Sequence, residues 1–79
     1  MSADTAVIYV RLLEEGTDAW RPTTGEQVRP GAYRLLPTDS YDPEDEVWEF
    51  PPGVIVRCEM KTLHDVQAHE VLVAVDRSS

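Results

Sequence analysis

The hydrophobic positions of this chain recur with a period of two over several short segments. Near the start of the chain, Ile8, Val10 and Leu12 lie on one face of an extended segment, and Tyr9 and Arg11 lie on the other. Alternation of this kind, with β-branched and aromatic residues, is typical of a half-buried β-strand. We therefore expect the chain to begin with a strand.

Similar segments follow, and turn signals separate them. Pro30-Gly31 has the order of a type II turn, and Pro52-Gly53 marks a second sharp turn. Because Pro22 has no N–H group, its strand is expected to lie at an edge or to end there. The expected strands cover residues 6–14, 19–24, 32–36, 46–50, 54–60 and 71–75, with irregular chain at 25–29, a loop at 37–45 and a polar connection at 62–69.

Five to six short strands at this spacing indicate an all-β barrel or sandwich. The 79 residues are enough for a single small domain, residues 1–79. One wall of its core is expected to consist of inward-facing residues from the fourth and fifth strands. These residues are Trp48, Phe50, Val54, Val56, Cys58 and Met60.

Four segments of the chain resemble a family of short uncharacterised bacterial proteins. The family pattern is VRLLxEGTDxWRP, then YRLL, then DEVWEFPPGxxVRC, and the matching segments here are residues 9–22, 33–36, 46–53 and 56–59. Val54 departs from it, because a small polar residue is common after the glycine. The resemblance implies an SH3-like barrel of five to six short antiparallel strands, and it implies no activity.

Charge and cysteine content restrict the partners and the location. The formal net charge is −8, from 15 acidic and 7 basic residues. Such a surface repels phosphate backbones and anionic lipids, so neither nucleic acid nor membrane is an expected partner. The single cysteine, Cys58, allows no intramolecular disulfide, and the chain begins without a signal peptide. A cytoplasmic protein is therefore expected.

No grouping of residues favours catalysis or a cofactor. The acidic run at 39–49 lacks the glycine and the regular spacing of a calcium loop. His64 and His69 lie with Asp65 and Glu70 in an expected loop that gives them no reason to converge on a metal. Cys58 is expected to point into the core rather than to act as a nucleophile. We expect no enzyme, no cofactor and no metal, and a metal site on these residues remains the least favoured alternative.

Two surfaces are candidates for binding a partner. The first consists of Tyr9, Arg11 and Trp20, because aromatic and arginine side chains are enriched at protein interfaces. Alternatively, Tyr9 and Trp20 form a small hydrophobic cluster beneath the turn at 15–18. The second surface is the acidic loop, and its candidate contacts are Asp42, Glu44 and Asp45. The arginines on the strands are expected to pair with acidic residues across the sheet.

These observations favour a non-catalytic protein-interaction module with an unidentified protein partner, either a monomer or a weak homodimer. An alternative is an acidic inhibitor or immunity-type protein that covers a basic site on a toxin or a nucleic-acid enzyme. The acidic run supports this second hypothesis, because acidic surfaces speed encounter with basic partners.

Overall fold

The alternating segments form six β-strands in the computed structural model, which describes residues 4–13, 19–39, 41–63 and 70–78. Within these ranges the chain contains no helix, and residues 37–39 and 41–45 form the expected irregular loop. The strands are β1 (Thr5–Leu13), β2 (Ala19–Arg29), β3 (Ala32–Leu35), β4 (Val47–Trp48), β5 (Ile55–Lys61) and β6 (Val71–Arg77). The prediction of a small all-β fold with five to six strands is confirmed.

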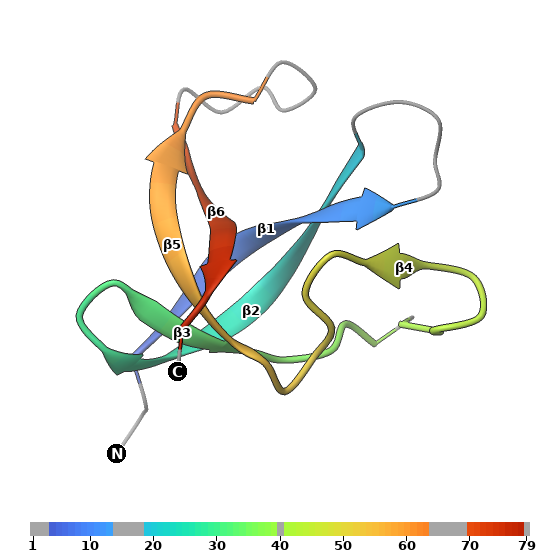
Figure 1. The fold of residues 1–79 in the computed structure, drawn as a ribbon, viewed down its shortest axis with the longest axis horizontal. Coiled ribbons are helices and arrows are strands. Elements are labelled where there is room, and N and C mark those ends of the chain that lie inside the picture. The colour runs from blue at the N-terminus through green and yellow to red at the C-terminus, as the bar shows by residue number, and fades with distance from the viewer. Residues whose placement is uncertain (1–3, 14–18, 40, 64–69, 79) are drawn as a thin grey trace.

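Five of these strands close into a ring. The sheet order is β2-β3-β5-β6-β1-β4, and an additional pairing of β2 with β1 makes a ring of the first five strands in this order. The short strand β4 lies outside the ring and pairs with the end of β1 through Leu12 and Leu13. In Figure 1, the β5–β6 pair crosses the β1–β2 pair, and β3 connects the two pairs at one end. The molecule is therefore a small β-barrel.

One pairing in the ring is parallel, whereas the sequence predicted antiparallel strands throughout. Ile8 pairs with Leu72 and Tyr9 pairs with Val73, with β1 and β6 running in the same direction. The other four pairings of the ring are antiparallel. A ring with an odd number of strands cannot alternate direction all the way round, so one parallel contact is unavoidable. This contact closes the barrel.

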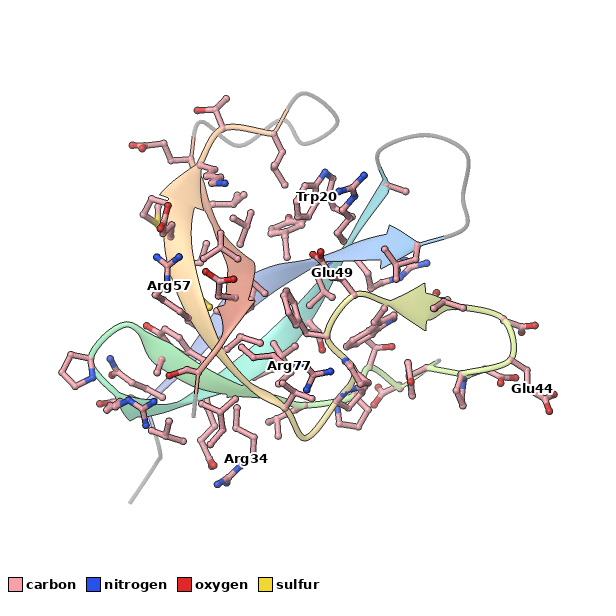
Figure 2. The ribbon with its side chains drawn as sticks, viewed as in Figure 1. Trp20, Arg34, Glu44, Glu49, Arg57 and Arg77 are labelled. Atoms are coloured by element: carbon pink, nitrogen blue, oxygen red, sulfur yellow. The ribbon has the colours of Figure 1, made fainter. Side chains whose placement is uncertain are left out.

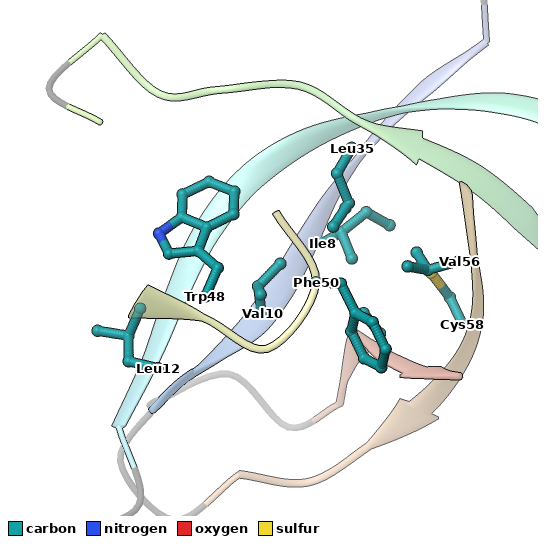
Figure 3. Close-up of a cluster of buried hydrophobic side chains, with 9 residues drawn as sticks. Ile8, Val10, Leu12, Leu35, Trp48, Phe50, Val56 and Cys58 are labelled. Atoms are coloured by element: carbon teal, nitrogen blue, oxygen red, sulfur yellow. The ribbon is translucent and has the colours of Figure 1, made fainter. Parts of the chain in front are cut away.

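The core lies inside the ring and contains the predicted residues of β1. Figure 3 shows Trp48 and Phe50 packed over the strands, together with the inward side chains of β1 and β5. Val54 packs against this cluster but is half-buried. The buried members are Ile8, Val10, Leu12, Leu35, Trp48, Phe50, Val56, Cys58 and Ala74. The core wall predicted from the fourth and fifth strands is confirmed, except at Met60.

Met60 was predicted to point into the core, but 53% of its surface is exposed. It follows Cys58, which is the last buried residue along β5, and it pairs with Leu72 near the start of β6. The strand therefore continues beyond the core, and its alternation no longer predicts burial there. The fourth strand is also shorter than predicted, because only Val47–Trp48 is paired.

Strand β2 is longer than predicted and runs through both Pro22 and Gly25. Pro22 is tolerated because β2 pairs only with β1 at that point, and the pairing with β3 begins at Gly25. Gly25 is buried where the side chain of Ile8 crosses it. Residues 25–29 therefore belong to a strand, and the predicted irregularity is limited to the step between Gln27 and Arg29. Gly25 allows close packing within this strand.

The two predicted Pro-Gly turns are confirmed. Gly31 has a φ of 78° and Gly53 a φ of 95°, values that favour glycine over residues with a side chain. Arg29 and Ala32 pair across the first turn, after an irregularity between Gln27 and Arg29. The first turn connects β2 to its partner β3. The second turn leads from β4 into β5, and the N–H of Gly53 donates a hydrogen bond to the carbonyl oxygen of Leu35 at the end of β3.

We expect Gly25→Ala to lower the free energy of unfolding by about 1–3 kcal/mol, as overpacking of a core typically does. A β-carbon at this position would lie 2.6 Å from Cγ1 of Ile8 and 3.1 Å from Cβ of Tyr33. Urea denaturation measures the change. As a control in the same strand, exposed Thr24→Ala should stay within about 0.5 kcal/mol of the parent. Equal stabilities for the two variants would contradict the packing assigned to Gly25.

Candidate functional site

The structure brings together the three residues of the first predicted surface. Arg11 pairs with Trp20 across the β1–β2 hairpin, and Tyr9 lies two residues before Arg11 on the same strand. Because directly paired residues of antiparallel strands point to the same side, all three side chains lie on the outer face of the hairpin. Arg11 is exposed, whereas Tyr9 and Trp20 are half-buried.

Tyr9 and Trp20 are half-buried because they pack against a second hydrophobic cluster outside the barrel. The buried members of this cluster are Leu63, Val71 and Val73. Val73 is fully buried on the outer face, while its neighbour Ala74 is buried in the main core. Strand β6 is thus covered on both faces. The alternative prediction of a small cluster for these aromatics is supported, although the 15–18 turn itself lies outside the described residues.

The most exposed large hydrophobic side chains of the described residues are those of Val7, on the outward side of β1, and Met60, beyond the core end of β5. Val7 is 58% exposed and Met60 is 53% exposed. Together with Tyr9, Leu72 and Glu70, they line an open depression beside the start of β6. A second depression lies on the opposite side of Val7, and its lining includes Pro22 and the Pro37–Asp39 segment. We call this combined surface the Val7 face.

The acidic loop is a separate surface. Oδ1 of Asp42 accepts a hydrogen bond of 2.9 Å from the backbone N–H of Glu44, and the carbonyl oxygen of Asp42 accepts bonds from the N–H groups of Asp45 and Glu46. Asp42 therefore orders a turn and is itself exposed. In Figure 2, Glu44 lies at the outer end of this loop and points away from the barrel, far from Trp20.

Glu46 has a structural role, although it belongs to the same acidic run. Its Oε1 accepts a hydrogen bond of 2.8 Å from Nε1 of Trp48, and its Oε2 lies 2.5 Å from an Nη of Arg21. These two donors lower the pKa of the Glu46 carboxyl, with the Trp48 bond as the larger cause, although desolvation opposes them. The ring of Tyr41 also contacts Trp48 edge-on, at 4.7 Å between centroids. This network fastens the acidic loop to β2.

The predicted pairing of arginine with acidic residues is confirmed. Arg34 of β3 lies 3.2 Å from Glu26 of β2, and Arg57 of β5 lies 2.8 Å from Asp76 of β6. Arg57 also pairs with Glu59 on its own strand. These groups are exposed, so each pair contributes little to stability.

Burial makes the thiol of the single cysteine unreactive. Cys58 is 9% exposed in the core, and this desolvation raises the pKa of its thiol to about 11. A thiol held in this state is a poor nucleophile at neutral pH. Among the described residues, no three His, Cys, Asp or Glu side chains gather as metal ligands. His64, Asp65 and His69 lie outside the described residues.

Sequence reasoning identified Tyr9, Arg11 and Trp20, but it missed the exposed apolar residues around them. Val7 lies on the outward side of the first strand together with Tyr9, so the alternation contained this signal. The uninterrupted apolar run from Val71 to Val75 contained a second one, since a strand buried on both faces does not alternate. The exposure of Met60 could not be predicted from its strand, because the alternation along that strand placed its side chain in the core.

The chain was compared with protein-family models, with curated proteins and with solved structures, and no match was found in any of the three. Over the part of the chain that the structure describes, no helix has the length and hydrophobicity needed to cross a membrane.

Glu46→Gln should reduce stability by about 1 kcal/mol at neutral pH, because glutamine keeps an acceptor for Trp48 but loses the charge that faces Arg21. The folded protein lowers the pKa of Glu46 below its usual value of 4.5. Its contribution is therefore complete above that value, and it is lost as pH falls through the lowered pKa. Urea midpoints measured at about pH 7 and about pH 3 should show the variant and the parent converging in acid.

Glu49→Gln serves as the matched control, since Glu49 is an exposed acid three positions along the chain. A constant difference between Glu46→Gln and the parent across this pH range would contradict the assigned role of the charge.

Proposed function

We propose that this protein is a non-catalytic, cytoplasmic protein-interaction module and that the Val7 face is its contact surface. One observation carries the proposal: Val7 and Met60, each more than half exposed, line one depression together with the half-buried ring of Tyr9. Contiguous exposed apolar surface on a small domain is typical of an interaction site.

The packing of the patch suits it for binding. Because Tyr9 already packs against the cluster of Leu63, Val71 and Val73, a partner would meet a ring that is restrained before binding. Restrained rings lose less conformational entropy on binding than free ones do. Half-buried aromatic residues with exposed aliphatic neighbours have the composition of an interface centre. The module itself is proposed to be a monomer or a weak homodimer.

The proposal is tested with Val7→Lys, in which a charge replaces the most exposed apolar side chain of the face. We expect the folded variant to lose captured protein partners by about tenfold relative to the parent, since it removes apolar contact and adds a desolvation cost. Quantitative affinity capture from the native host, with thermal unfolding of each bait, gives the measurement. Val7 is preferable to Tyr9 or Trp20 because truncating either ring would also disturb the second cluster.

Val28→Lys provides the matched control. Val28 is 37% exposed and lies at the irregularity near the β2–β3 turn, outside the residues of the Val7 face. If Val7→Lys retains the same partners as Val28→Lys and the parent, the Val7 face is not the contact surface.

A second candidate function is the acidic inhibitor or immunity-type protein. What favours it is the anchoring of the loop by Glu46 and the Asp42 turn, which leaves Glu44 and Asp45 exposed in a defined arrangement. In this case the double variant Glu44→Lys, Asp45→Lys should no longer capture the basic partner protein. The association rate of the parent with that partner should fall steeply as the salt concentration rises. Capture that withstands both changes would count against this function.

A further inference from the structure

The two depressions of the Val7 face form one track across the barrel. Val7 lines both of them. Pro22 and the Pro37–Asp39 segment line the first depression, on one side of Val7. Tyr9, Leu72 and Glu70 line the second depression, on the other side. The strands crossed by this track are neighbours in the order β2, β1, β6 and β5. The track therefore runs across the strands rather than along one of them.

The length of the track suits a short extended peptide. Neighbouring strands lie about 4.8 Å apart, so the three steps from β2 to β5 span about 14 Å. An extended chain rises about 3.3 Å per residue, so about four residues cover this distance. Each depression can then receive one side chain, with Val7 between them. A segment of about six residues would cover the track and extend by one residue beyond each of its ends.

The depression beside Tyr9 is lined mainly by apolar side chains, whereas the one beside Pro22 combines Val7 and two prolines with three threonines. Each depression also contains one acidic residue. Asp39 lines the depression beside Pro22, and Glu70 lines the one beside Tyr9. Both acids are exposed. No Lys or Arg lines either depression within the described residues. Such a track favours apolar side chains flanked by positive charge.

Thr38 adds a polar group to the first depression. Its hydroxyl oxygen is buried and has no hydrogen-bond partner. The hydroxyl of threonine both donates and accepts hydrogen bonds, so a side-chain rotation would allow it to meet a backbone group of a bound peptide. An unpaired hydroxyl in a binding depression gives a bound segment a polar contact at little cost.

We propose that the Val7 face binds an extended protein segment in which two or three apolar residues are flanked by Lys or Arg. This inference rests on the proposed function and names the chemistry of its partner. The cationic residues meet Asp39 and Glu70, and the apolar ones occupy the depressions on either side of Val7. A second copy of this chain suits the track poorly, because each copy carries a net charge of −8 and would place acids against acids.

The test is selection from a random heptapeptide display library with the intact protein as bait. Peptides in which Lys or Arg flank two or three apolar residues should be enriched. Their affinity is then measured by fluorescence anisotropy for the parent and for Asp39→Lys and Glu70→Lys. Each reversal should weaken binding about fivefold or more, since it replaces an attraction by a repulsion.

Glu44→Lys is the matched control, because it makes the same change in net charge at the far end of the acidic loop (Figure 2). It should change the affinity less than about twofold. Enrichment of acidic or uncharged peptides, absence of enrichment, or equal losses for Glu44→Lys and the two track variants would each overturn the inference. The proposed function would survive those results if Val7→Lys still lost native partners, and it would fail separately if Val7→Lys retained them.

Discussion

The parallel contact between β1 and β6 is the constraint on which the rest of the structure depends. It consists of the pairs Ile8–Leu72 and Tyr9–Val73, and it converts an open meander into a ring. The same contact places Ile8 in the main core and Tyr9 over the second cluster. The Val7 face exists because this pairing brings the start of the chain beside residues near its end.

The fold was predictable where local signals agreed with the final packing. Alternation identified β1 and its inward face, and the Pro-Gly pairs identified two turns. The extent of β2 was not predictable, because Gly25 is a turn signal in isolation and becomes a packing residue only beneath Ile8. The parallel closing pair was missed for a similar reason, since strand direction around a ring depends on how many strands the ring contains.

The candidate site was predictable in part. The outward side of the first strand identified Tyr9 and Arg11, and the pairing of the hairpin added Trp20. Glu46 could not be separated from the other acids of its run, because the partner that distinguishes it, Arg21, lies 25 positions away in the sequence. The depressions around Val7 are equally invisible to sequence, since they combine residues from opposite ends of the chain with the loop that precedes β4.

Closure by the two terminal strands has a consequence for synthesis of the protein. Ile8 and Leu72 lie more than sixty positions apart, so the ring cannot close until β6 has left the ribosome. Before that moment, the β1–β2 and β2–β3 hairpins can pair locally, but β1 has one open edge. The apolar residues on that edge stay unpaired until β6 has been synthesised. During this time they are exposed to intermolecular association, which the cell has to prevent.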